Sequence, residues 1–132
     1  MEQKKLKVVV VGGVAGGASA AARIKRLDEQ AEVVVFEKGP DVSFSNCSLP
    51  YYLSGTVEDS EDLVMMTPAS FRKKHDIDVR VRTEVLSIDR AAKTVTVRNE
   101  ETGETYSEAY DKLVLSPGAN PIVPPPLRSC MG

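Results

Sequence analysis

A short β-branched run that ends in glycine constrains this chain more than any other feature. Residues 6–11 read L-K-V-V-V-V, which is typical of a strand buried on both faces of a parallel sheet. Helix-forming residues follow over 16–29, and a second β-branched run covers 32–37. A strand, a glycine turn, a helix and a second strand within about 30 residues predict a βαβ unit with a right-handed crossover.

The predicted helix over 16–29 has one apolar face and several polar faces. Small and aliphatic residues at helical spacing mark the side that we expect to pack on the sheet, namely Ala18, Ala20, Ala21, Ala22, Ile24 and Leu27. Charged residues mark the faces that we expect to meet solvent, namely Arg23, Lys25, Arg26 and Asp28. The pattern therefore predicts an amphipathic crossover helix.

A loop and a second helix separate this unit from the rest of the chain. Residues 39–55 are rich in Ser, Pro, Asn and Gly, which indicates an irregular loop with one helical turn at 49–53. Residues 67–75 begin with Thr67 as a helix N-cap and Pro68 at the first helical position. We therefore expect a short surface helix there.

The second half of the chain alternates apolar and polar residues. Such alternation over 78–82, 85–89, 94–98 and 104–110 predicts one strand followed by an antiparallel meander. The run 112–116 is again typical of a buried strand. The predicted fold class is therefore α/β, a Rossmann-like domain with a parallel sheet, a crossover helix and an antiparallel β-meander.

Prolines mark the predicted end of the domain. Pro121 and the run Pro124, Pro125 and Pro126 exclude a helix or sheet interior. We expect residues 1–121 to form the N-terminal part of the domain, which would be incomplete, and residues 122–132 to be an exit linker or an atypical tail.

Composition excludes several function classes. The 132 residues can bury one core of ordinary domain size, and 17 basic residues nearly balance 19 acidic ones. We therefore expect no nucleic-acid partner, and without a long apolar run we expect no membrane partner and a cytoplasmic protein. The two cysteines, Cys47 and Cys130, lack the spacing of a disulfide framework or a metal site.

The glycine-rich turn carries the first sign of function. Residues 11–17 read V-G-G-V-A-G-G, where Gly12 suits a tight turn and Gly17 suits close packing of helix on sheet. Val14 stands where the dinucleotide-binding fingerprint has its middle glycine. A diphosphate would rest on the helix N-terminus, where free N–H groups and the helix dipole favour negative charge.

Glu37 supports this interpretation. It lies twenty residues beyond Gly17, where a carboxylate can accept hydrogen bonds from an adenosine ribose and repel a 2′-phosphate. The alternative is a solvated glutamate at a strand end. Neither feature distinguishes FAD from NAD.

Four segments together resemble one enzyme family. They read G-G-V-A-G-G at 12–17, F-E-K at 36–38, S-F-S-N-C-S-L-P-Y at 43–51 and L-V-L-S-P-G-A at 113–119. The chain up to about residue 121 closely resembles coenzyme A disulfide reductases. These belong to the single-cysteine branch of the pyridine nucleotide-disulfide oxidoreductases, which also contains NADH oxidases, NADH peroxidases and polysulfide reductases.

The resemblance implies a role for each matching residue. FAD would be bound by Gly12, Ala15, Gly16, Gly17, Glu37, Lys38, Val85, Ser116 and Gly118. Coenzyme A, or another low-molecular-weight thiol or disulfide, would be contacted by Ser19, Arg23, Arg26, Ser43 and Asn46. Cys47 would be the redox nucleophile beside the flavin ring, and NAD(P)H would be the electron donor. The sequence departs from the family at His75, which takes the place of a lysine that helps to hold coenzyme A, with Lys73 and Lys74 adjacent.

The chemistry of Cys47 follows from a missing partner. Disulfide reductases of the two-cysteine type carry C-x-x-x-x-C, but the second position here is Tyr52. Cys47 would therefore form its redox bond with a group outside the chain, as a mixed disulfide, a persulfide or a sulfenic acid.

Three functions remain open from the sequence. The first is reduction of coenzyme A disulfide or a related persulfide or polysulfide, and the second is the activity of an NADH oxidase or peroxidase. The third is a non-catalytic FAD-binding module. Family members also carry a second nucleotide-binding domain and a dimerisation domain, so we expect homodimers of the full-length protein and no turnover by this chain alone.

Overall fold

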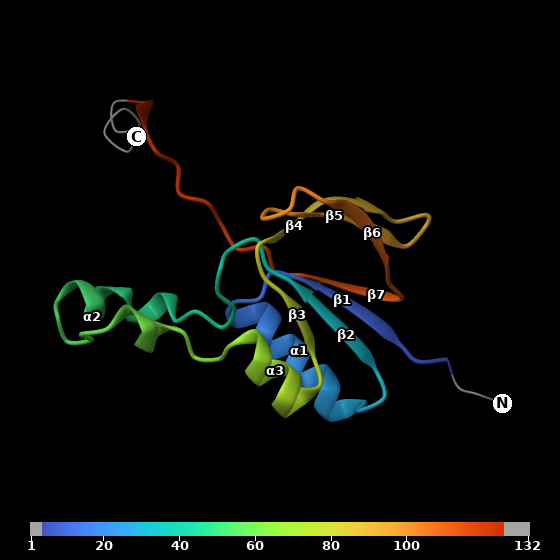
Figure 1. Ribbon diagram of the computed structural model, residues 1–132, viewed down its shortest axis with the longest axis horizontal. Helices are drawn as coiled ribbons and strands as arrows, with labels where there is room; N and C mark the ends of the chain where they lie inside the picture. The colour runs from blue at the N-terminus through green and yellow to red at the C-terminus, as the bar shows by residue number, and fades with distance from the viewer. Residues whose placement is uncertain (1–3, 126–132) are drawn as a thin grey trace.

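Three layers build the chain, and the computed structural model describes residues 4–125 of it. A parallel sheet lies in the middle (Figure 1). Helices α1 (Ala15–Leu27) and α3 (Pro68–His75) cover one face of this sheet, and an antiparallel sheet covers the other. This arrangement confirms the predicted fold class. Cys130 and most of the predicted tail lie outside the described residues.

The central sheet contains four parallel strands in the order β3-β2-β1-β7. Their bounds are Lys7–Val11 for β1, Glu32–Phe36 for β2, Asp78–Arg80 for β3 and Lys112–Leu115 for β7. Strand β1, helix α1 and strand β2 form the predicted βαβ unit, with bounds within one or two residues of those expected. The carboxyl ends of β1, β2 and β7 therefore meet at one edge, where ligands bind in sheets of this type.

The valines of β1 and β2 alternate between two cores, because successive side chains of a strand point to opposite faces. The helix side buries Val8, Val10, Val33 and Val35 with Ala18, Ala21, Phe71 and Ile77. The other side buries Val9, Val34, Phe36, Val95 and Val97. Burial on both faces explains why β1 and β2 read as continuous apolar runs rather than alternating ones.

The antiparallel sheet is the predicted meander. Its strands β4 (Thr83–Asp89), β5 (Thr94–Asn99) and β6 (Thr105–Ala109) pair in chain order. Strand β4 begins three residues after the end of β3, and its Thr83 N–H donates to the Glu37 carbonyl at 2.9 Å, so β4 starts at the edge at which β2 ends.

Glu108 links the two sheets. Its Oε1 accepts a hydrogen bond from Lys7 on β1, and its Oε2 accepts one from Arg80 on β3 at 3.1 Å. Arg80 also donates to the hydroxyl of Tyr106 at 3.0 Å. Burial raises the pKa of Glu108, but the pairs with Lys7 and Arg80 outweigh burial and leave that pKa below its usual range. Glu108 is therefore ionised and paired in the neutral range.

An arm extends from the layers between β2 and α3 (Figure 1). It contains η1 (Asn46–Ser48), the predicted helical turn as α2 (Leu49–Leu53), and η2 (Ser60–Leu63). At its base, the Met65 N–H donates to the Ser43 carbonyl at 3.0 Å, and the Ser45 N–H donates to the Leu63 carbonyl at 2.7 Å. These bonds join the outgoing and returning segments of the arm.

Helix α3 begins as the sequence predicts. Pro68 is the first helical residue, and the Thr67 hydroxyl accepts a hydrogen bond from the Ser70 N–H at 3.2 Å.

No helix among residues 4–125 is long and apolar enough to span a membrane.

Three expectations about exposure are wrong. Lys25 is 8% exposed rather than solvated, because its ammonium group donates to the carbonyls of Glu29 and Ala31 at 2.6 and 2.9 Å. Leu27 is 71% exposed, since it lies at the helix end beyond the sheet. Strand β7 is not buried on both faces: it is an edge strand of the described sheet, and its Leu115 is 58% exposed.

Candidate functional site

The glycine turn after β1 is held in place by backbone contacts that exclude side chains. Gly12 has a φ of +94°, and a Cβ there would lie 2.0 Å from the Ser116 carbonyl oxygen. A Cβ on Gly17 would lie 1.6 Å from the Gly12 carbonyl oxygen. Both positions therefore require glycine, one for the left-handed turn and both for the close approach of neighbouring backbone.

Helix α1 begins at this turn without a capping side chain. Its N-cap is Val14, and no acidic residue lies in its first turn. Ala15 and Gly16 are exposed, and a Cβ on Gly16 would lie 2.4 Å from the Ser116 Oγ. An uncapped, exposed helix start next to glycine backbone fits an anionic group, because its first N–H groups have no intrahelical acceptor.

A pocket of about 220 Å³ lies at the same sheet edge. It is lined by Val11, Gly12, Phe36, Glu37, Lys38, Thr83, Glu84, Val85, Pro117 and Asn120. The structure thus brings together four residues that the sequence assigned to the cofactor, Gly12, Glu37, Lys38 and Val85. Ser116 and Gly118, two further residues that the sequence assigned to the cofactor, lie in the loop after β7 on either side of the lining residue Pro117. We refer to this hollow as the strand-end pocket.

Glu84 is a charged residue of the strand-end pocket that the sequence did not reveal. Its Oε1 lies 3.2 Å from the Lys38 ammonium, and its Oε2 lies 3.0 Å from the Arg98 guanidinium. The hydrogen bond with Lys38 is the largest cause that holds the pKa of Glu84 below its usual range. The Lys38 side chain is therefore drawn toward β4 in this structure.

The Glu37 carboxylate holds two backbone amides. Its Oε1 accepts a hydrogen bond from the Gly13 N–H at 3.1 Å, and its Oε2 accepts one from the Gly39 N–H at 3.0 Å. Each carboxylate oxygen has two lone pairs, so both retain capacity for a ribose hydroxyl. Gly13 was not among the expected site residues, because its partner is fixed only by the three-dimensional fold.

The loop that carries Cys47 is attached to the glycine turn. The Ser43 N–H donates to the Gly13 carbonyl at 2.8 Å, and Ser43 has a φ of +55°. Cys47 follows in η1, where both Asn46 and Cys47 are exposed. The thiol of Cys47 is accessible to a reactant rather than packed in hydrocarbon, as a reactive cysteine requires.

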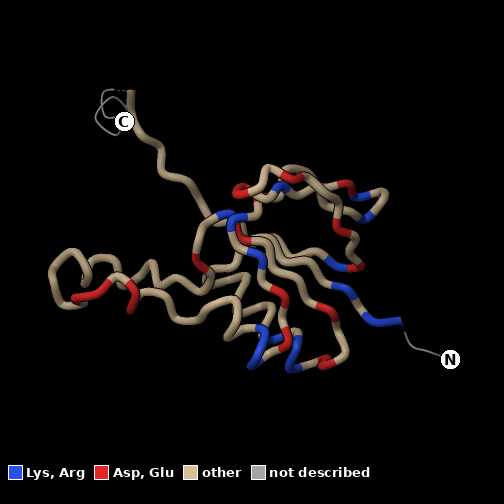
Figure 2. The backbone as a smooth tube through the Cα atoms, in the orientation of Figure 1, with Lys and Arg blue, Asp and Glu red and all other residues tan. Residues whose placement is uncertain are grey.

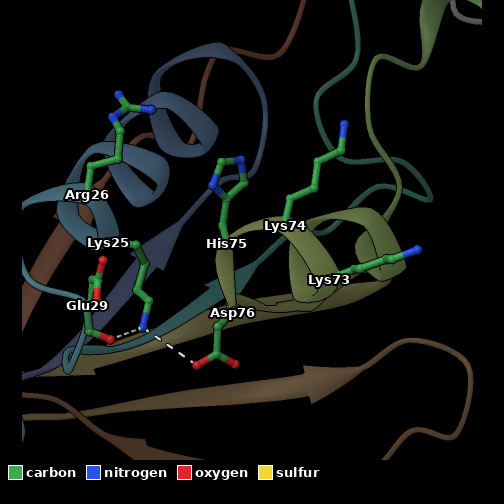
Figure 3. Close-up of a pocket in the computed structure, with 7 residues that line it drawn as sticks. All are labelled: Lys25, Arg26, Glu29, Lys73, Lys74, His75 and Asp76. Atoms are coloured by element: carbon green, nitrogen blue, oxygen red, sulfur yellow. Dashed lines mark hydrogen bonds and ion pairs between the residues drawn. The ribbon is translucent and has the colours of Figure 1, made fainter.

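Three residues expected to contact a substrate share one face of α1. Ser19, Arg23 and Arg26 are four and three residues apart, and all three are exposed. Arg26 lines a groove of about 340 Å³ between the C-terminal ends of α1 and α3 (Figure 3). Ser19 and Arg23 do not line this groove. Its lining residues are Lys25, Arg26, Glu29, Lys73, Lys74, His75 and Asp76.

The groove between α1 and α3 is mainly basic. The Lys25 ammonium lies 3.7 Å from the Asp76 carboxylate, so these two charges offset one another. Arg26, Lys73 and Lys74 form no ion pair with any residue in 4–125, and Figure 2 shows basic residues gathered at these helix ends. The groove therefore suits an anionic group such as a phosphate.

Comparison with known families agrees with this geometry. The family model described as pyridine nucleotide-disulphide oxidoreductase matches residues 6–129, which is nearly the whole chain. The chain belongs to this family.

Among residues 4–125, no three side chains of His, Cys, Asp or Glu lie together as metal ligands would.

Individual pyridine nucleotide-disulphide oxidoreductases are similar to this chain in sequence and in fold. The coenzyme A disulfide reductase of Staphylococcus epidermidis is 47% identical over 114 residues, which are 86% of this chain and 26% of that protein. The crystal structure of reduced Bacillus anthracis CoADR-RHD has a TM-score of 0.89 at 49% identity, over 95% of this chain and 22% of that one. The NAD-dependent persulfide reductase from A. fulgidus has a TM-score of 0.87 at 41% identity, over 91% and 22%.

These relatives confirm the resemblance to coenzyme A disulfide reductases that the sequence motifs carry. The chain spans about a quarter of the length of the curated relatives it matches. Relatives with different substrates share its fold at similar scores. Fold similarity therefore establishes the family but does not identify the substrate. The substrate has to be inferred from the residues of the site.

Proposed function

We propose that this chain is the FAD-binding part of an NAD(P)H-dependent oxidoreductase that reduces coenzyme A disulfide through Cys47. The observation that carries the proposal is the bond between Ser43 and Gly13, because it attaches an exposed thiol to a dinucleotide-binding turn. Family membership and the coenzyme A disulfide reductase relatives support the reaction class.

The residues present fit FAD. Gly12 and Gly17 allow the backbone of the turn to pack closely on its neighbours, and the exposed, uncapped start of α1 that follows would hold the diphosphate. Glu37 would accept the ribose hydroxyls in the strand-end pocket, with Val85 beside the adenine. When bound, the flavin supplies the transfer of two electrons from NAD(P)H to sulfur.

Cys47 supplies the thiol chemistry. Its thiolate attacks one sulfur of coenzyme A disulfide, the S–S bond breaks, and one coenzyme A leaves as a thiolate that takes a proton. Cys47 then holds the other coenzyme A as a mixed disulfide. Two electrons from NAD(P)H and one proton cleave that bond, release the second thiol and restore the Cys47 thiolate. The net reaction converts one disulfide, one NAD(P)H and one proton into two thiols and NAD(P)⁺.

The face of α1 suggests how coenzyme A lies. Ser43 and Asn46 belong to the Cys47 loop near the start of α1, whereas Arg26 lies in the basic groove near its end. Arg26 lies seven positions after Ser19 in the helix, which corresponds to a rise of about 10 Å. An extended substrate would place its thiol near Cys47, run past Ser19 and Arg23, and place a phosphate in the groove with Lys74 or His75.

Substrate tests on the full-length protein decide between this function and its alternatives. NAD(P)H oxidation should depend on coenzyme A disulfide and release two thiols per nicotinamide. Preference for a persulfide or polysulfide would move the protein to that branch of the family. Oxidation that needs only oxygen or peroxide would support an NADH oxidase or peroxidase, and no oxidation with any of these would support a non-catalytic module.

A further inference from the structure

Glu37 makes more contacts than ribose binding requires. Its two carboxylate oxygens accept the N–H groups of Gly13 and Gly39, at 3.1 and 3.0 Å. Gly13 lies before α1 and Gly39 lies after β2, so one side chain joins two separate backbone segments at the carboxyl edge of the sheet.

We propose that Glu37 is a positioning residue that sets the Cys47 loop relative to the glycine turn, in addition to its proposed contact with a ribose. The importance of Cys47 itself rests on the function proposed above. The positioning, by contrast, depends only on hydrogen bonds among residues 4–125.

Gly13 connects Glu37 to the Cys47 loop through two hydrogen bonds. Its N–H is held by Glu37, and its carbonyl accepts the Ser43 N–H at 2.8 Å. The residue has little room to move, because a Cβ there would lie 2.8 Å from Val42 Cγ2 and 3.3 Å from Val35 Cγ1. A residue whose N–H is fixed by Glu37 and whose Cα is packed in this way offers Ser43 a well-placed carbonyl acceptor.

Ser43 connects the glycine turn to the arm. It adopts the left-handed region at a φ of +55°, and its carbonyl accepts the Met65 N–H at 3.0 Å. Ser43 thus contacts both the glycine turn and the returning segment of the arm. Cys47 lies four residues further along, so the orientation of the thiol depends on where Ser43 is held.

Replacement of Glu37 by glutamine disrupts this chain of contacts in a defined way. An amide has one acceptor oxygen, and its NH₂ group cannot accept a hydrogen bond. Either Gly13 or Gly39 then loses its partner. A residue that only binds ribose would not affect the cofactor-free protein when it is changed.

The test uses cofactor-free protein with Cys130 replaced by serine and a nitroxide label on Cys47. In Glu37→Gln we expect a label of greater mobility, and amide exchange faster by about fivefold, the effect of one ordinary hydrogen bond, at Ser43 and at whichever of Gly13 and Gly39 loses its acceptor. Asp41→Asn is the matched control, since it removes the same charge from the same loop but forms no hydrogen bond within residues 4–125.

Three results would overturn the proposal. They are label mobility and exchange equal to those of the unaltered protein in a folded Glu37→Gln variant, equal changes in Asp41→Asn, and unprotected Gly13 and Gly39 amides in the unaltered protein. If Glu37→Gln does not fold, Glu37→Asp gives a smaller change in the same direction. No turnover is measured, so a catalytic failure of Cys47 leaves these readouts unaffected.

Discussion

The Ser43 N–H donates to the Gly13 carbonyl at 2.8 Å, and this one bond joins the two parts of the site. Gly13 belongs to the turn where a dinucleotide would lie, and Ser43 opens the loop that carries Cys47. This bond therefore ties the start of the Cys47 loop to the turn.

The proposed function makes Cys47 the residue on which turnover depends. In the full-length protein, Cys47→Ser should lower release of coenzyme A thiol by at least about a thousandfold, because a hydroxyl is a far weaker nucleophile at neutral pH. Flavin content should stay unchanged, as measured by absorbance. Cys130→Ser is the cysteine control, and a comparable loss there would point to the wrong thiol.

Gly17 tests the packing of the glycine turn. Gly17→Ala should destabilise the fold by about 2–4 kcal/mol, because its Cβ would lie 1.6 Å from the Gly12 carbonyl oxygen and helix α1 would have to move. Urea unfolding measures the change. Gly39→Ala is the control, since its nearest contact would be 3.7 Å away, and equal losses in both variants would contradict the packing argument.

The basic groove tests the substrate placement. Arg26→Ala and Lys74→Ala should each weaken binding of coenzyme A by about three- to tenfold, with a weaker effect at high salt. Titration calorimetry on the full-length protein measures the affinity. Arg72→Ala controls for charge in the same helix turn, because Arg72 pairs with Asp76 at 3.8 Å and does not line the groove. An equal loss in Arg72→Ala would indicate general attraction rather than a site.

Glu108 gives a pH dependence of stability. Its pKa is lowered in the fold, so its stabilising contribution is present above the ordinary glutamate pKa and is lost as pH falls through the folded value. The raised pKa of Lys7, caused chiefly by its hydrogen bond to Glu108, keeps the pair charged throughout the neutral range.

Glu108→Gln should therefore cost about 1–2 kcal/mol at pH 7, and the difference from the unaltered protein should shrink below about pH 4. Urea unfolding at a series of pH values measures it. Glu104→Gln controls for charge, since Glu104 lies in an exposed turn and its carboxylate has no partner in 4–125. A difference that stays constant down to pH 3 would argue against the ion pairs.

The sequence predicted the helices and strands of the fold, though not how the layers stack, because periodicity is a local property. The valine runs of β1 and β2 and the Thr67-Pro68 start of α3 were readable without the structure. The exposure of Leu27 and the burial of Lys25 were not, because they depend on where the helix ends relative to the sheet and to α3.

The site was predicted in part. Gly12 and Glu37, which the fingerprint singled out, meet in one pocket with Lys38 and Val85, which the family resemblance implied. Gly13 and Glu84 were missed, since their partners are distant in sequence or on another sheet. The roles of the predicted residues in binding FAD and coenzyme A, and the domain boundary near residue 121, stay predictions.

The most direct test of the account is whether the Cys47 sulfur lies against the flavin. In the full-length protein with FAD bound, the visible flavin absorbance should be recorded before and after complete alkylation of Cys47. The account predicts a shifted or reshaped flavin band that is absent in Cys47→Ser under the same reagent. A band unchanged after full alkylation would contradict it.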